Sequence, residues 1–133
     1  MRRVLISIPG KPMGEPRKRI TTVNGFPRCY TPPKASDYRA LAIMCARQAM
    51  LGQTMFSGPT TVIIEAVFPR PKRCKTHAVT TKPDADNIAK IVCDALNGIV
   101  YADDKLIVML VVYKWYEDDM HQVGVNVSVS GGE

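Results

Sequence analysis

The side chains best suited to chemistry in this chain of 133 residues lie between positions 84 and 104. They are, in order, Asp84, Asp86, Lys90, Asp103 and Asp104. Carboxylates held close together repel one another, and a hard divalent cation with oxygen ligands removes that repulsion. Such an ion can polarise a phosphodiester oxygen and orient water, and a neighbouring lysine adds positive charge to the transition state. The pattern therefore indicates phosphodiester hydrolysis with Mg²⁺ as the cofactor, for which Mn²⁺ is an expected substitute.

A helix is expected to place these groups. Pro83 disfavours a helical conformation for the residue before it, so the approach to the helix is expected to be extended, with Asp84 and Asp86 on the same side. Asp86 is then the expected cap of a helix over residues 87–96, which Asn97-Gly98 closes. Both carboxylates should face one site at the helix entrance. One acid of the Asp103-Asp104 pair should join them if the following strand lies beside that entrance.

Each of these residues also has an ordinary structural interpretation. Asp86 could be only a helix cap, Lys90 and Asp94 only a surface pair four residues apart, and Asp103-Asp104 only turn residues. A calcium-binding loop fits badly, because Ile88 and Ala95 stand where oxygen ligands are needed.

Composition and charge narrow the class of protein. The chain is 46% hydrophobic with a net charge of +6, and its longest apolar run, Leu106–Tyr113, has eight residues. A disordered chain and a membrane span are therefore excluded. Residues 1–82 hold 15 Lys or Arg against three acids, whereas residues 83–133 hold three Lys against nine acids. This division suits a protein that grips a polyanion and also holds a cation.

The chain is expected to form one domain over residues 1–133, with no membrane partner and no organic cofactor. A cytoplasmic location is expected because its N-terminus lacks a signal-peptide pattern. Its four cysteines form no close pair and are expected to be free thiols.

The rest of the chain supplies the elements that must hold the site. Residues 11–28 read as a loop or loose hairpin with a short strand near residues 20–23, and Pro69–Pro83 reads as a long exposed loop. A helix is expected from Ser36 or Asp37 to about Leu51. Strands are expected at Val4–Ile8, Thr60–Phe68, Leu106–Tyr116 and Gln122–Ser130.

The two last strands differ in pattern. Leu106–Tyr116 is apolar nearly throughout and is expected to be buried on both faces, whereas the alternating valines of Gln122–Ser130 predict an edge or half-buried strand. The order of elements predicts an α/β (α+β) fold, a mixed β-sheet with two main helices packed on it.

The acidic segment resembles a known family. The matching positions are Asp84, Asp86-Asn87, Lys90, Asp94-Ala95-Leu96-Asn97-Gly98 and Tyr101-Ala102-Asp103-Asp104. This ordered run resembles the RusA-type Holliday junction resolvases of bacteria and their prophages, closely over residues 82–108. The N-terminal part is similar to phage-type members in Lys11-Pro12, in Arg17-Lys18-Arg19 and in Tyr30-Thr31-Pro32.

The resemblance implies a small homodimeric, Mg²⁺-dependent endonuclease that cuts four-way DNA junctions by paired symmetric nicks. It implies that Asp84, Asp86 and Asp104 are the metal-binding catalytic acids and that Lys90 is the essential lysine. Asp103 is either a further metal ligand or a support for the turn, and Asp94 is expected to be mainly structural. Two alternatives stay open: a metal-dependent nuclease for other branched DNA such as a flap or fork, and a non-catalytic phage DNA-binding protein.

DNA binding and dimerisation also follow as expectations. Seven basic residues should contact backbone phosphates without reading sequence: Arg17, Lys18, Arg19, Arg70, Lys72, Arg73 and Lys75. A four-way junction has two-fold symmetry, which a C2 homodimer matches. Leu106–Tyr113 is a candidate interface strand as well as a candidate core strand.

Overall fold

The structure, a computed structural model, describes residues 1–16, 19–30 and 33–132, without the side chains at positions 19, 29 and 30. Arg17 and Lys18, two of the expected DNA contacts, therefore lie outside the described residues, and so does the side chain of Arg19. The elements in chain order are β1 (Arg2–Pro9), β2 (Arg19–Val23), β3 (Phe26–Tyr30), α1 (Pro33–Ala49), β4 (Thr60–Phe68), α2 (Ala85–Leu96), the 3₁₀ turn η1 (Asp104–Leu106), β5 (Ile107–Tyr116) and β6 (Gly124–Gly131).

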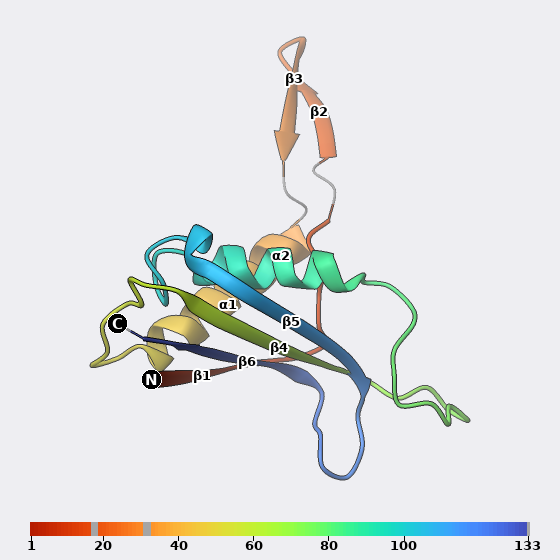
Figure 1. Cartoon of the computed structure of the whole chain (residues 1–133). Helices are drawn as coiled ribbons and strands as arrows, with labels where there is room; N and C mark the ends of the chain where they lie inside the picture. The colour runs from red at the N-terminus through yellow and green to blue at the C-terminus, as the bar shows by residue number, and fades with distance from the viewer. Residues whose placement is uncertain (17–18, 31–32, 133) are drawn as a thin grey trace.

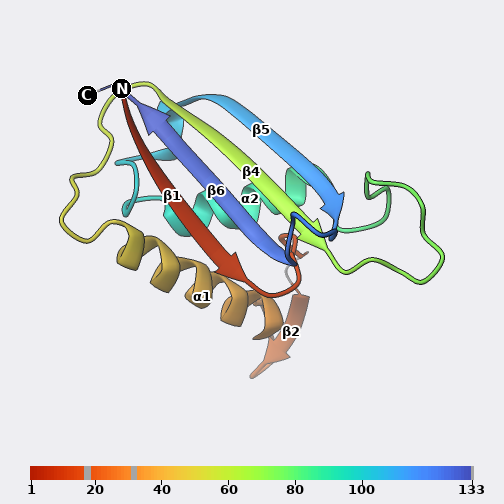
Figure 2. The same cartoon turned by 90° about the horizontal axis from the view of Figure 1, so that it is seen from below.

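Four strands form one mixed sheet in the order β1-β6-β4-β5. The β4–β5 pair is parallel, and the pairs β1–β6 and β4–β6 are antiparallel. Both helices lie against the same face of this sheet (Figures 1 and 2). The mixed sheet with two main helices confirms the predicted fold class.

The core lies between the helices and the covered face of the sheet. Side chains alternate between the two faces of a strand, so every second residue of β1, β4 and β6 points into this core. These buried residues are Val4, Ile6, Ile8, Val62, Ile64, Ala66, Val125, Val127 and Val129. The apolar stripe of α2 packs on them with Ile88, Ile91, Val92, Ala95 and Leu96, all buried.

The expected burial of β5 on both faces is wrong, and of the two alternatives for β6, an edge or a half-buried strand, the half-buried one is confirmed. β5 lies at an edge of the sheet, and Val108, Met109 and Leu110 are 71%, 56% and 47% exposed. β6 lies in the middle of the sheet, between β1 and β4. An apolar run does not by itself show what covers it, and here the helices cover only one face of the sheet. The alternating valines of β6 do match a central strand with one buried face.

The predicted hairpin exists between β1 and α1. β2 and β3 pair with each other as a separate two-stranded sheet, and the turn between them is Asn24-Gly25. Both turn residues have positive φ, 51° and 81°, as a tight two-residue hairpin turn requires. The hairpin stands away from the four-stranded sheet (Figure 1).

The first helix begins earlier than expected. α1 starts at Pro33 and ends at Ala49, so neither Ser36 nor Asp37 is its cap. Proline is well tolerated in the first turn of a helix, where its missing N–H has no partner to lose. Among the described residues, no helix is long and apolar enough to span a membrane.

Candidate active site

Helix α2 carries the first acidic residues of the site. Asp84 is the residue before the helix and Asp86 lies in its first turn, so the expectation that Asp86 caps a helix over 87–96 is wrong by two residues. Asp86 therefore lies on helical backbone, whereas Asp84 lies on the extended backbone before it. Lys90 and Asp94 lie one and two turns further along, and both are exposed.

Two cavities flank α2 and divide its acids. A cavity of about 470 Å³ between α2 and the start of β5 is lined by Asp86, Ala89, Lys90, Cys93, Asp104 and residues 107–110. A larger cavity of about 1470 Å³ on the side of α1 is lined by Asp84, Asn87, Lys90 and Asp94 together with residues of α1 and of segment 11–16. Asp84 thus lines the larger cavity and Asp86 the smaller one, and a single site for both carboxylates stays a prediction. Lys90 lines both cavities.

A short turn brings Asp104 back to α2. Tyr101, fully buried, donates a 2.6 Å hydrogen bond from its hydroxyl to the carbonyl oxygen of Cys93 in α2. Burial raises the pKa of this tyrosine, so the hydroxyl stays protonated and can donate. The backbone of the turn is held as well, since the N–H of Ala102 donates to the carbonyl of Phe56 at 3.1 Å. Asp104 is thus presented from an anchored turn.

Asp103 and Asp104 have different environments. The carboxylate of Asp103 accepts a 3.0 Å hydrogen bond from the backbone N–H of Lys105, and this bond lowers the pKa of Asp103. A hydrogen bond between the two carboxyl groups is the main cause that raises the pKa of Asp104, and the negative charges of Asp103 and Asp94 add to it. Asp103 therefore caps η1, while Asp104 is the acid that reaches the cavity shared with Asp86.

The acids do not form a preassembled metal site. Among the described residues, no three His, Cys, Asp or Glu side chains are gathered closely enough to hold an ion. Burial raises the pKa of the Cys93 thiol, and the nearby negative charge of Asp104 adds to this effect. Cys93 lies seven residues after Asp86, which is about 10 Å along the helix axis at about 1.5 Å per residue. The carboxylate oxygens of Asp86 and Asp104 are nevertheless the hard donors that Mg²⁺ and Mn²⁺ prefer, and they face one cavity. The donor chemistry fits such an ion.

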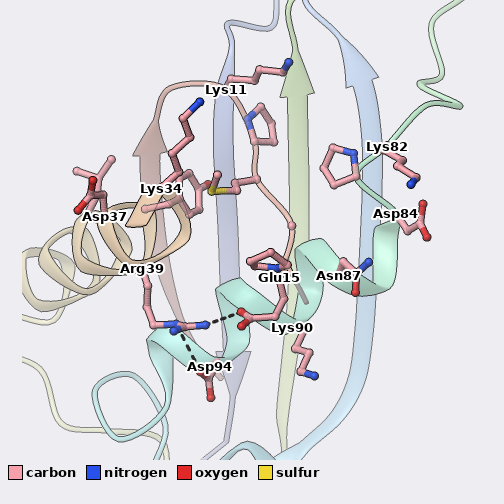
Figure 3. Close-up of a pocket in the computed structure, with 17 residues that line it drawn as sticks. Lys11, Glu15, Lys34, Asp37, Arg39, Lys82, Asp84, Asn87, Lys90 and Asp94 are labelled. Atoms are coloured by element: carbon pink, nitrogen blue, oxygen red, sulfur yellow. Dashed lines mark hydrogen bonds and ion pairs between the residues drawn. The ribbon is translucent and has the colours of Figure 1, made fainter. Parts of the chain in front are cut away.

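The larger cavity contains residues that the spacing of the acids did not predict (Figure 3). Arg39 of α1 forms ion pairs with Glu15 and, at 3.6 Å, with Asp94. The backbone N–H of Glu15 also donates to the carbonyl of Asn87 at 2.9 Å. Segment 11–16 thus ties α1 to α2, which agrees with the structural role expected for Asp94.

Close packing reinforces this tie. A Cβ atom on Gly14 would lie 2.7 Å from the Cβ of Pro83 and 3.1 Å from the Cβ of Asn87 in α2, so glycine allows this close approach. No pattern in the sequence links positions 14 and 83, which lie far apart along the chain.

The basic loop after β4 has two kinds of residue. Arg70 is committed to the fold: its side chain donates to the carbonyls of Glu117, Cys74 and Thr76 at 2.9–3.1 Å, and its backbone N–H donates to the Glu117 carboxylate. Three other basic side chains of the loop are exposed, namely Lys72, Arg73 and Lys75. Of the four loop residues expected to contact DNA, these three are exposed, whereas Arg70 is engaged by hydrogen bonds within the fold.

Comparison with known proteins shows the family of this chain. Residues 9–128 match the family described as Endodeoxyribonuclease RusA. The chain is also 29% identical over 128 residues to the uncharacterized protein YqaN of Bacillus subtilis (strain 168), a match that covers 87% of this chain and 89% of that protein. The family activity is endonucleolytic cleavage of phosphodiester bonds in DNA, directed at Holliday junctions and in general dependent on a divalent metal. The chain belongs to the RusA endodeoxyribonuclease family.

Proposed function

We propose that this chain is a Mg²⁺-dependent resolvase that cuts four-way DNA junctions by paired symmetric nicks. One observation carries the proposal: Asp86 and Lys90 from α2, and Asp104 from a separate turn, line a single cavity. Two acids and a lysine from distant positions, facing one space at the surface, suit a metal and a scissile phosphate better than they suit any structural role.

Each residue of the site has a proposed role. Asp86 and Asp104 would hold the metal, and Asp84, on the other side of Lys90, is the third proposed ligand. The bound ion supplies Lewis-acid stabilisation of the phosphate and lowers the pKa of attacking water. Lys90 adds positive charge where negative charge develops on the phosphate. Asp103 supports the turn by capping η1.

A homodimer is proposed because resolution needs two nicks related by two-fold symmetry. The second copy would dock on the exposed apolar side chains of β5, which support this proposal. The N–H of Val79 donates to the carbonyl of Lys114, and the N–H of Tyr116 donates to the carbonyl of His77, so the chain itself covers the last part of this edge. The part that stays uncovered by described residues, 107–112, includes the four residues of β5 that line the cavity with Asp86 and Asp104. A second copy on this edge would therefore adjoin the site.

DNA is proposed to be gripped through its backbone, in the cytoplasm of a bacterial or phage-infected cell. The exposed Lys72, Arg73 and Lys75 are the described candidates, and Arg17, Lys18 and Arg19 remain candidates from sequence. Phosphate contacts of this kind make affinity fall steeply with salt and carry no sequence preference.

The test is cleavage of an immobile synthetic four-way junction, with and without Mg²⁺, beside a flap, a fork and a linear duplex of equal length. We expect paired symmetric nicks only on the four-way junction, and only when Mg²⁺ is present. Equal cutting of flap or fork would show a nuclease for other branched DNA. Binding to the junction without cutting under Mg²⁺ or Mn²⁺ would show a non-catalytic DNA-binding protein.

A further inference from the structure

The hairpin β2–β3 presents an apolar tip to solvent. Phe26 is 71% exposed and Val23, its partner across the strands, is 40% exposed. The hairpin joins neither the four-stranded sheet nor the helices (Figure 1), and a two-stranded hairpin has no core of its own. Exposed aromatic and β-branched side chains at the end of such an arm mark a binding surface.

The two faces of the hairpin differ. Residues paired across antiparallel strands point to the same side, and side chains alternate along each strand. Val23 and Phe26 at the tip therefore share a face with Thr21 and Arg28, one step further from the tip. Ile20, also 71% exposed, lies on the opposite face. One face thus combines an apolar tip with an exposed arginine behind it.

Charge indicates what this arm binds. Between Glu15 and Asp37 every charged residue is basic: Arg17, Lys18, Arg19, Arg28 and Lys34. A polyanion complements this arm, whereas the apolar surface of another protein does not require five cations. In proteins that deform DNA, apolar side chains wedge between base steps while neighbouring cations hold the phosphates.

The root of the arm lies at the larger cavity, which shares Lys90 with the cavity of Asp86 and Asp104. Glu15 and Pro16, which precede the hairpin, and Lys34, which follows it, line the larger cavity together with Asp84 and Lys90 (Figure 3). Five residues per strand at about 3.4 Å each give the hairpin a length of about 17 Å. DNA bound at the site therefore comes within reach of the tip.

We propose that Phe26 and Val23 insert between bases at the branch point of the DNA substrate, with Arg28 on a flanking phosphate. This inference rests on the proposed function, in which the substrate is branched DNA. A branch point interrupts base stacking, so less energy is needed to open a base step there. The arm would then supply part of the preference for branched DNA over linear duplex, which backbone contacts alone do not provide.

The experiment compares Phe26→Ala with Ile20→Ala, a control in the same hairpin with the same exposure but on the opposite face. Affinity is measured without divalent cation for an immobile four-way junction and for linear duplex, with 2-aminopurine at the branch point reporting unstacking. Phe26→Ala should weaken junction binding by about 10-fold, in the range of one lost base–aromatic stack, and abolish the fluorescence change. Duplex affinity, and both affinities of Ile20→Ala, should stay within about twofold of wild type.

Three outcomes would overturn the proposal: equal junction affinity of Phe26→Ala and wild type, equal loss on junction and duplex, or a changed monomer–dimer equilibrium of Phe26→Ala in sedimentation velocity. The last would assign the tip to a protein contact. Cleavage of the junction by the wild-type protein, measured in parallel with Mg²⁺, tests the proposed resolvase activity separately from the proposed role of the hairpin. Wild-type cutting together with any of these outcomes overturns only the role of the hairpin.

Discussion

The hydroxyl of Tyr101 caps helix α2 by donating to the carbonyl oxygen of Cys93, and this buried contact helps to hold the turn that carries Asp104 against the helix that carries Asp86. The N–H of Asn97, the usual helical partner of that carbonyl, instead donates to the carbonyl of Asp94. Tyr101 therefore supplies a donor that the end of the helix lacks. Asp104 follows three residues later, so its position relative to α2 depends on this bond.

Tyr101→Phe should lower the free energy of unfolding by about 1–3 kcal/mol, because a buried carbonyl loses its partner. It should also slow junction cleavage more than it weakens junction binding, because Asp104 is displaced. Urea denaturation and single-turnover kinetics measure the two effects. Tyr38→Phe is the matched control, since the buried hydroxyl of Tyr38 has no partner among the described residues. If both variants lost the same stability, the Tyr101 bond would not be the cause.

The Asp103–Asp104 pair should titrate in two separated steps in the metal-free protein. The mutual hydrogen bond raises the pKa of Asp104, and the Lys105 N–H lowers that of Asp103, so Asp104 is the group that takes up a proton first as pH falls. Asp103→Asn removes the neighbouring negative charge and offers an amide donor, so the pKa of Asp104 should fall. Carboxyl-detected NMR titration checks this. An unchanged or higher pKa of Asp104 in Asp103→Asn would contradict the assigned roles.

Substitutions in the basic loop after β4 should have two different effects, one on the stability of the fold and one on DNA binding. Arg70→Gln should lower the melting temperature, because its guanidinium holds three carbonyls of the fold. The triple variant Lys72→Gln, Arg73→Gln, Lys75→Gln should melt as wild type but bind junctions with a salt dependence reduced by about 2–3 in log–log slope, at about 0.9 for each lost phosphate contact. A triple variant with wild-type salt dependence would remove this loop from the DNA interface.

The exposed edge of β5 should control the oligomeric state. A lysine in the middle of an edge strand prevents strand pairing, so Met109→Lys should convert a dimer into a monomer in sedimentation equilibrium. Met120→Lys, in the turn between β5 and β6 and 86% exposed, should remain dimeric. A wild-type protein that is monomeric while it makes paired nicks would refute the proposed interface.

The sequence predicted where the strands lie along the chain well, but it predicted their positions within the sheet poorly. Thr60–Phe68 is β4 residue for residue, since a β-branched run between turn signals has one interpretation. The place of β5 at the edge and of β6 at the centre depends on pairing over long distances, which local periodicity does not encode.

The candidate site shows the same division. Asp86, Lys90 and Asp104, which the family motif singled out, line one cavity, while their catalytic roles stay predictions. The division of Asp84 and Asp86 between two cavity linings was not expected, because the helix begins two residues early and a shift of two residues along a helix turns a side chain by about half a turn. The tie between Glu15, Arg39 and Asp94 was missed because three separate segments supply it.

The most direct test of the central claim is the cleavage rate of Asp86→Asn on an immobile four-way junction in Mg²⁺, with binding measured on the same sample. Asp119→Asn, an exposed acid outside both cavities, is the control. The site described here predicts that Asp86→Asn binds the junction at least as tightly as wild type, because a negative charge near the phosphate is gone, but cuts it at least about 100-fold more slowly, in line with the loss of one transition-state contact. Cleavage by Asp86→Asn at the wild-type rate would contradict a metal site at Asp86 and Asp104.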